Sequence, residues 1–273
     1  MRRISKLIGV ILSDGSVDKK RYTVSFTEDK DVVERLIKEF EEIENINLNW
    51  RIDQQVNSFR ARVYSKKLVD LLFKFSPSFR TRSYDVHPKC ECLDKGGYPP
   101  TKIPLKIILK PNLIKLFLRY YITCDGGPEF SLYKRNDKNV IQLHVGIKIG
   151  CDNPIIKDQM HHMLNIIGIK ANKKKSGLSI RKLSEIKKFH KLVGFLEESK
   201  VRRGKLFKNY KKNDVIKLII FCGYLTSKFN WINKNFQNIE NLEIFLINCI
   251  KLVNNRRKLA NFVKTKLNFY TQS

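Results

Sequence analysis

Two acidic residues stand at matching places in two separate segments of the chain. Residues 7–15 (LIGVILSDG) and 118–126 (LRYYITCDG) each have the pattern of an apolar helix that ends in Asp-Gly, so Asp14 and Asp125 fall at the helix tips. Carboxylate oxygens are ligands that Mg²⁺ accepts, usually one or two of them together with water and substrate phosphates. The repetition predicts a matched pair of metal ligands. The alternative is that each Asp-Gly only shapes a turn, which is a common role of these residues.

The composition points to a polyanionic partner. The chain carries 54 Lys and Arg residues against 26 Asp and Glu residues, for a formal net charge of +28. A positive charge of this size attracts polyanions, and nucleic acid is the partner that it favours. A solvated, lysine-rich surface is the alternative, but it would place more acids among the lysines. We therefore expect DNA or RNA to face Asp14 and Asp125.

Cysteine usage and hydropathy indicate the cellular compartment in which we expect the protein. The six cysteines are scattered, mostly in apolar periodic segments, which is typical of buried thiols in a reducing compartment. We expect an intracellular location in the cytoplasm, the nucleoid or an organelle. No apolar run of about 18 residues occurs, so we expect neither a membrane span nor a membrane partner. His87, Cys90 and Cys92 approach a metal-ligand spacing, but no second ligand pair follows them.

Helix and strand signals occur in the same order twice, which predicts an α+β fold with two pseudo-symmetric α-β-β-α-β-β-α repeats. Helical apolar spacing alternates with segments in which every second residue is apolar. The first helix should stop at Gly15 through the left-handed conformation that glycine adopts readily. The expected helices cover 4–13, 32–43, 68–75, 112–124, 154–167 and 183–196, and the expected strands cover 21–27, 47–53, 58–64, 130–135, 140–149, 169–173 and 177–181.

Composition divides the chain into three parts. Proline and glycine concentrate between 76 and 102, which predicts a linker with little regular structure. From residue 200 onward, basic residues far outnumber acids and helix signals dominate, at 214–225, 239–253 and 256–268. The expected parts are a first repeat with its linker at 1–102, a second repeat at 103–199, and a basic helical extension at 200–273.

The alternating strands predict one apolar and one polar face for each sheet. Successive side chains of a strand point to opposite faces, so the apolar set should pack on the core. The expected core-facing residues are Tyr22, Val24, Phe26, Leu48, Trp50, Ile52, Phe59, Ala61 and Val63 in the first repeat and Leu143, Val145 and Ile147 in the second.

The polar faces are the predicted nucleic-acid contacts. Arg, Lys, Asn, Gln and Thr dominate them, and these residue types bind phosphates and base edges. An ordinary solvated face, the alternative, would hold more Glu and Asp. The expected contacts are Arg21, Thr23, Ser25, Asn49, Arg51, Arg60, Arg62, Arg135, Gln142, His144, Lys148, Lys170, Asn172, Lys174 and Arg181.

The two Asp-Gly helices and the repeated helix–sheet order resemble the LAGLIDADG homing endonucleases in their single-chain, two-motif form. The resemblance covers about residues 4–196. It implies two motif helices packed on a pseudo-twofold axis, each followed by a saddle-shaped antiparallel sheet that lies on double-stranded DNA. It also implies that Asp14 and Asp125 hold the catalytic metal, with Mg²⁺ as the cofactor and Mn²⁺ as a substitute. Lys148 is the further catalytic residue that the resemblance suggests.

The residues at the expected helix interface depart from a small-residue pattern at one place. Gly9 and Ser13 are small and four residues apart, which permits close approach of two helices. In the second motif Cys124 is small, but Tyr120 stands where a small residue is expected. Tyr120 must therefore fill space beside Gly9 or tilt the helices apart.

These observations predict a monomeric, site-specific, Mg²⁺-dependent endonuclease that cuts both strands of DNA. The first repeat lacks a Lys or Gln that matches Lys148, which predicts slow or asymmetric cleavage. One alternative is an RNA-binding maturase that assists intron splicing, with structured intron RNA as its partner. Another is a DNA-binding regulator on the same fold, with a helix-turn-helix near 222–224. The paired acids favour the nuclease, because a protein that only binds phosphates has no use for carboxylates beside them.

Overall fold

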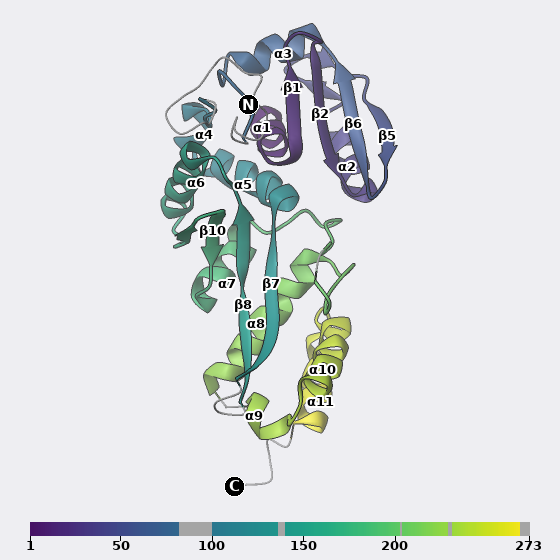
Figure 1. Ribbon diagram of the computed structural model, residues 1–273, viewed down its shortest axis with the longest axis vertical. Coiled ribbons are helices and arrows are strands. Elements are labelled where there is room, and N and C mark those ends of the chain that lie inside the picture. Colours follow the sequence, from purple (N-terminus) through teal and green to yellow (C-terminus); the bar gives the residue numbers. More distant parts are fainter. Residues whose placement is uncertain (82–99, 136–139, 203, 229–230, 268–273) are drawn as a thin grey trace.

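Two four-stranded antiparallel sheets, each preceded by a helix that ends in Asp-Gly, form the framework of the chain (Figure 1). The computed structural model describes residues 1–81, 100–135, 140–202, 204–228 and 231–267. His87, Cys90, Cys92 and most of the expected linker lie outside the described residues.

The first repeat follows the predicted order of elements. Its sheet has the strand order β1-β2-β6-β5, and a short β3–β4 hairpin follows α2. The elements are α1 (Arg2–Asp14), β1 (Gly15–Asp18), β2 (Thr23–Glu28), α2 (Lys30–Glu39), β3 (Glu42–Ile43), β4 (Ile46–Asn47), β5 (Arg51–Gln55), β6 (Ser58–Tyr64) and α3 (Lys66–Phe73).

The second repeat and the C-terminal helices follow. The second sheet has the equivalent strand order β7-β8-β10-β9. The elements are α4 (Leu105–Ile108), α5 (Pro111–Asp125), β7 (Gly126–Arg135), β8 (Val140–Gly150), α6 (Pro154–Ile166), β9 (Asn172–Lys174), β10 (Gly177–Ile180), α7 (Leu183–Leu192), α8 (Lys212–Lys228), α9 (Trp231–Asn235), α10 (Ile239–Leu252) and α11 (Arg256–Lys266). The predicted α+β fold with two matching repeats is thus confirmed, whereas β1, α4 and α9 had no clear sequence signal.

The expectation that Gly15 ends the first helix in a left-handed conformation is wrong. Gly15 has φ −116° and ψ 179°, which is extended, and β1 begins at this residue. A Cβ atom at Gly15 would lie only 2.5 Å from Cα of Ile11. Gly126 is also extended, and its Cβ would lie 2.8 Å from the carbonyl oxygens of Ile122 and Lys148. Each glycine is therefore required by the tight helix-to-strand junction, not by a positive φ.

The inward faces of the sheets pack on the helices mostly as predicted. Val24, Phe26 and Val63 are buried. Two predicted core residues are exposed instead. Tyr22 has φ 51° in the turn between β1 and β2 and is 39% exposed. Ile52 lies on β5, the edge strand of the first sheet, and is 46% exposed, because it projects from the margin of the sheet, where fewer neighbours surround it.

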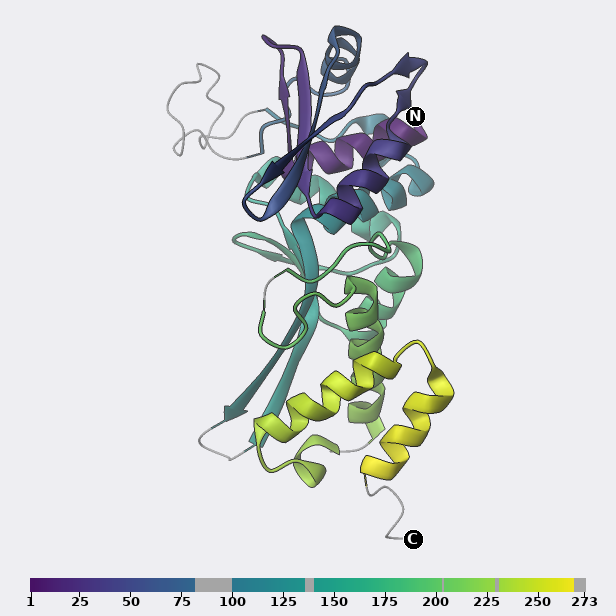
Figure 2. The ribbon, with the colours of Figure 1, turned by 90° about the vertical axis from the view of Figure 1, so that its right-hand side faces the viewer.

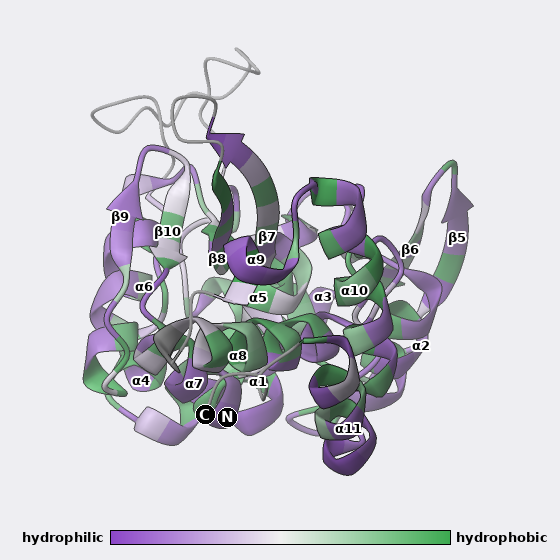
Figure 3. Cartoon of the chain, turned by 90° about the horizontal axis from the view of Figure 1, so that it is seen from below, coloured by the Kyte–Doolittle hydropathy of each residue, from purple (hydrophilic) through white to green (hydrophobic). Residues whose placement is uncertain are grey.

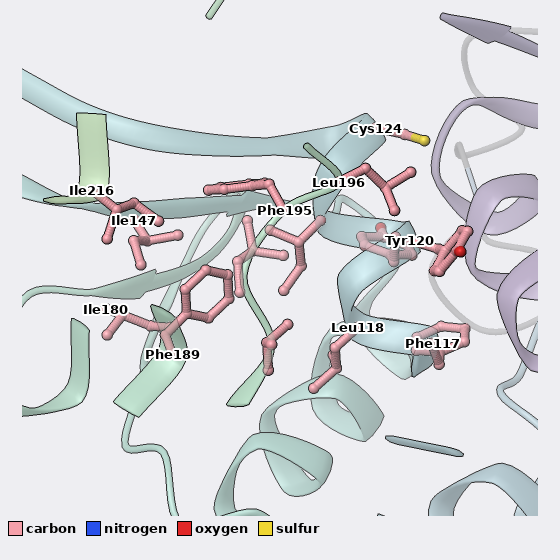
Figure 4. Packing of buried hydrophobic residues seen from close by; sticks show 14 of the residues in the cluster. Phe117, Leu118, Tyr120, Cys124, Ile147, Ile180, Phe189, Phe195, Leu196 and Ile216 are labelled. Carbon is pink, nitrogen blue, oxygen red and sulfur yellow. The ribbon is translucent and has the colours of Figure 1, made fainter. Parts of the chain in front are cut away.

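The C-terminal helices pack on the second sheet. Figure 2 shows α8 running beside the long strands β7 and β8. Ile216 of α8 belongs to the buried cluster with Ile147, Phe189 and Phe195 (Figure 4). Figure 3 shows that α8 is largely hydrophobic, while α11 and β9 are largely hydrophilic. A helix-turn-helix near 222–224 is excluded, because these residues lie within the continuous helix α8.

Two further observations on the described part of the chain concern membrane spans and cysteines. None of its helices has the length and hydropathy of a membrane span. Its four cysteines, Cys124, Cys151, Cys222 and Cys249, are buried and free.

Candidate active site

Helices α1 and α5 cross at Gly9, and this crossing sets the positions of both acids. A Cβ atom at Gly9 would lie 2.7 Å from the carbonyl oxygen of Phe117 and 3.2 Å from the backbone nitrogen of Tyr121. The missing side chain therefore allows the two backbones to touch. Asp14 and Asp125 are the last residues of the two helices.

The remaining interface residues accommodate this close crossing. Tyr120 fills the space beside Gly9. A Cβ atom added at Gly9 would lie 3.3 Å from the Cβ of Tyr120, and Tyr120 is 2% exposed. Its hydroxyl donates a hydrogen bond to Glu39 of α2, and burial, together with this bond, holds the pKa of Tyr120 far above its usual value. Ser13 and Cys124 also lie at the interface, and the Ser13 hydroxyl donates to the carbonyl oxygens of its own helix at 2.8 and 3.0 Å.

Asp14 and Asp125 open into one cavity of about 630 Å³ between the repeats. Burial, with added effects of Cys151, Asp125 and Asp14, raises the pKa of the Tyr121 phenol well above its ordinary value. Asp14 also borders a second cavity of about 550 Å³ on the side of the first repeat. The structure therefore brings the two predicted ligands together.

Lys148 lines the same cavity as the two acids. It is exposed on β8, directly opposite Gly127 of β7 and Ser179 of β10. The cross-strand register shows what replaces it in the first repeat. Gly126 pairs with Ile149 as Gly15 pairs with Phe26, so Ser25 occupies the place of Lys148. The two halves of the site are chemically unequal.

A glycine on β8 makes room for the carboxylate of Asp125. A Cβ atom at Gly150 would lie 2.4 Å from Oδ1 of Asp125 and 2.9 Å from Oδ2. The backbone of the strand therefore lies directly against the acid. Nearby, the phenol of Tyr121 donates to the carbonyl oxygen of Gly150 at 3.0 Å, which ties the end of β8 to α5.

Lys212 is a site residue that the sequence did not reveal. It is the first residue of α8, it lines the cavity, and it is 7% exposed. Its Nζ donates to the carbonyl oxygens of Thr123 at 2.6 Å and Gly126 at 2.7 Å. Burial lowers its pKa to about 8. No local pattern distinguishes Lys212 from the other lysines of the C-terminal region.

Arg202 also lines the cavity and joins it to the first repeat. Its guanidinium forms an ion pair with Glu28, which is 2% exposed, and lies 3.2 Å from the carboxylate of Asp29. Two further ion pairs join the segment around Arg202 to α2: Lys200 with Asp31 at 2.8 Å and Glu198 with Arg35 at 2.6 Å. The segment between α7 and α8 thus bridges the two repeats beside the acids.

The donors present fit a hard divalent cation. Burial and Asp14 raise the pKa of Cys124 to about 12, and burial and Asp125 raise that of Cys151 to about 11. Both thiols are therefore protonated in the cation-free site, and the carboxylate oxygens of Asp14 and Asp125 are the donors that a hard cation prefers. Within the described ranges, no group of three or more His, Cys, Asp and Glu residues could hold a metal. A pair of carboxylates suits an ion that keeps several waters, as Mg²⁺ does.

The predicted nucleic-acid contacts of the first sheet share one polar face. Residues directly opposite in an antiparallel sheet project to the same face. Arg62 pairs with both Ser25 and Arg51, and two residues earlier on β6 Arg60 lies on the same face. Thr23 continues this face at the start of β2. Two predicted contacts lie outside the strands: Arg21 in the β1–β2 turn, and Asn49, which is exposed before β5.

The second sheet gathers its predicted contacts in the same way. Along β8, Gln142, His144 and Lys148 alternate on the polar face, and Asn172 joins them through its pairing with Ser179. Lys174 ends β9. The other predicted contacts lie at the margins of the sheet: Arg135 at the end of β7, Lys170 before β9, and Arg181 after β10, 3.5 Å from Glu129.

Comparisons with known proteins match the fold. No protein-family model and no curated protein sequence matches the chain. Among solved structures, a point mutant of I-SmaMI has a TM-score of 0.51 at 15% identity, over 93% of this chain and 99% of that one. A variant of I-DmoI in complex with its target DNA and Mn has a TM-score of 0.46 at 14% identity, over 71% of this chain and 93% of that one. The homing endonuclease I-WcaI, bound to its DNA recognition sequence, has a TM-score of 0.43 at 18% identity, over 72% and 84%.

The match to I-SmaMI changes the extent of the expected resemblance. It covers 93% of the chain, which is more than residues 4–196, so it includes part of the C-terminal region. This agrees with the packing of α8 on the second sheet and with the position of Lys212 in the cavity. The chain therefore has the fold of the LAGLIDADG homing endonucleases.

Proposed function

We propose that this protein is a site-specific DNA endonuclease of the homing type, which hydrolyses one phosphodiester on each strand with a divalent metal held by Asp14 and Asp125. One observation carries the proposal: two carboxylates at the tips of crossed helices open into a single cavity that Lys148 and Lys212 also line. The two sheets that carry the polar faces begin directly after the acids, at Gly15 and Gly126.

The position of the acids favours a cation beside them. The C-terminal end of a helix carries a partial negative charge, so a carboxylate there is unfavourable unless a positive charge compensates it. Asp14 and Asp125 both occupy such ends. Lys212 compensates α5 in part, because its ammonium bonds the last carbonyl groups of that helix. Divalent cations bound by the two acids would compensate both helices, and we assign each acid to the cut of one strand.

The residues around the acids have separate tasks in this proposal. A bound divalent metal supplies activation of water and stabilisation of the leaving oxygen. We propose Mg²⁺ in this role, with Mn²⁺ as a substitute. Lys148, exposed at the cavity, binds the phosphate that is to be cut. Lys212 is protonated at neutral pH, because its pKa is about 8, and it holds the junction of α5 and β7 on which Asp125 stands.

DNA binding falls to the two sheet faces and to the excess of positive charge. Arg and Lys on these faces neutralise phosphates and place the duplex, while the side chains between them contact base edges. Both acids belong to one chain, so we propose that a monomer cuts both strands. The different residues at the positions of Lys148 and Ser25 make the two cuts unequal in rate.

The test uses a randomised duplex DNA library, incubated with the protein in the presence and absence of Mg²⁺. We expect Mg²⁺-dependent ends with a fixed stagger, found by sequencing the DNA ends. Asp14→Asn and Asp125→Asn should each reduce this double-strand cleavage by a large factor. Asp70→Asn, on the exposed side of α3, is the matched control and should cut at the wild-type rate.

Two results would contradict the proposal. Cutting of both strands at the wild-type rate by either active-site variant would remove the acids from the reaction. Sequence-specific binding without any cuts would favour a regulator, or a maturase if structured intron RNA binds more tightly than duplex DNA.

A further inference from the structure

The two sheets present different polar chemistry on the faces that we propose to bind DNA. The cross-strand register defines these faces, because opposed residues in an antiparallel sheet point the same way. One face is dominated by guanidinium groups, and the other carries uncharged amide, imidazole and hydroxyl groups around Gln142 and His144. This difference bears on which base pairs each half of a DNA site contains.

The polar face of the first sheet carries three arginines at its centre. Arg62 lies between Arg51 on β5 and Ser25 on β2, and Arg60 lies opposite Asp53. The Arg62 guanidinium lies 3.8 Å from the carboxylate of Asp53, so its orientation is partly fixed before DNA binds. A guanidinium fits O6 and N7 of guanine with two hydrogen bonds, and a carboxylate accepts from N4 of cytosine. This face is therefore suited to G·C pairs.

The part of the second polar face around Gln142 and His144 is uncharged. Gln142 lies opposite Tyr133, and His144 lies opposite Ser131. Gln142 and His144 are partly exposed, so both can reach a ligand on the sheet. A Gln side chain fits N6 and N7 of adenine with two hydrogen bonds.

The charged residues of the second face lie on either side of Gln142 and His144. Arg135 ends β7 on one side. On the other side, Glu129 lies opposite Gly146, 3.5 Å from Arg181, so the two charges offset each other, and Lys148 follows at the cavity. The side chains available to base edges around Gln142 and His144 are thus amide, imidazole and hydroxyl groups, which suit A·T pairs.

We infer that the DNA site has two unlike halves, a G·C-rich block under the first sheet and an A·T-rich block under the second. The inference rests on the proposed function and adds the base composition of its substrate. It is a statement about the base pairs beneath Arg60 and Arg62 in one half and beneath Gln142 and His144 in the other.

The test is selection of bound duplexes from a randomised library by the full-length protein in EDTA, followed by sequencing. We expect the bound DNA to contain a G·C-rich block on one side of the cleavage centre and an A·T-rich block on the other. Two matched variants assign the blocks. Arg62→Ala should lower the preference in the G·C block only, and Gln142→Ala should lower it in the A·T block only. The expected loss at one base pair is about fivefold to a hundredfold.

A third variant tests for a change of base preference, which the loss of a side chain alone would not produce. Gln142→Arg should change the preferred pair at its position from A·T to G·C, while the other half of the site stays the same. All three variants change a side chain on a polar sheet face, and melting temperatures equal to wild type would show that each variant is folded.

The outcomes separate this inference from the proposed function. Selected duplexes with equal base composition in both halves would overturn the inference, as would loss of preference in the same half from Arg62→Ala and Gln142→Ala. Cleavage in Mg²⁺ would then still support the endonuclease. If no duplex is retained selectively and none is cut, the proposed function fails, and this inference fails with it.

Discussion

Replacing Gly150 by alanine should move the carboxylate of Asp125 and slow DNA cleavage. The added Cβ atom would lie 2.4 Å from Oδ1 of Asp125, whereas ordinary contact begins at 3.4 Å. The carboxylate or the strand must therefore shift by about 1 Å. A misplacement of about 1 Å in a catalytic constellation can lower the rate roughly a hundredfold. Because Asp14 is untouched, the cut that depends on Asp125 should slow more than the other.

Gly127→Ala is the matched control, since it adds the same methyl group on the neighbouring strand. Its Cβ would meet only Cε of Lys212, at 4.0 Å, which is ordinary contact. The assay is single-turnover cleavage of a supercoiled plasmid that carries the selected site, with DNA binding measured separately in EDTA. We expect nicked circles to accumulate with Gly150→Ala, at unchanged affinity, and linear product to form normally with Gly127→Ala.

One result would refute this reasoning. If Gly150→Ala binds DNA and cuts both strands as fast as wild type, the position of the Asp125 carboxylate against β8 has no bearing on catalysis. A fall in affinity together with a lower melting temperature would instead show that the substitution disturbs the fold of the second sheet.

Further predictions concern stability. Burial lowers the pKa of Lys212 from 10.5 to about 8, so the unfolded chain binds more protons between these pH values. The free energy of unfolding should therefore rise with pH across this window, by up to about 3 kcal/mol, and Lys212→Met should lack this rise in urea titrations from about pH 7 to 10.5. Arg202→Ala leaves the buried Glu28 without this ion partner and should lower the free energy of unfolding by about 3 kcal/mol. Adding Glu28→Gln in a double variant should restore part of this loss. An unchanged unfolding midpoint for Arg202→Ala would argue against the bridge between the repeats. Gly9→Ala should cost about 1–3 kcal/mol, because its Cβ would meet the Phe117 carbonyl oxygen at 2.7 Å, and a thermal melt equal to wild type would count against the tight crossing. Tyr120→Phe removes the hydrogen bond to Glu39 and should lower the unfolding free energy by about 1 kcal/mol, measured by denaturant titration.

The sequence by itself determined the order of helices and strands and the place of the two acids. Helical and strand periodicities are local properties of the sequence, so they can be recognised without knowing how the elements pack. The Asp-Gly ends predicted where Asp14 and Asp125 fall, and both are the last residues of their helices. Alternation likewise predicted the polar side of each sheet. It wrongly assigned Tyr22 and Ile52 to the core, because Tyr22 lies in a turn and Ile52 on an edge strand.

Only the tertiary structure decided what surrounds the acids. Lys212 and Arg202 reach the cavity from a segment far from either motif, and nothing in their local sequence marks them out. The role of Gly150 depends on where the end of β8 passes α5. Tyr120 is accommodated at the helix crossing because Glu39 of α2 accepts a hydrogen bond from its hydroxyl. Each of these contacts joins residues that are distant in the chain. Such contacts follow from how whole elements pack, and a local pattern of residue types carries no record of that packing.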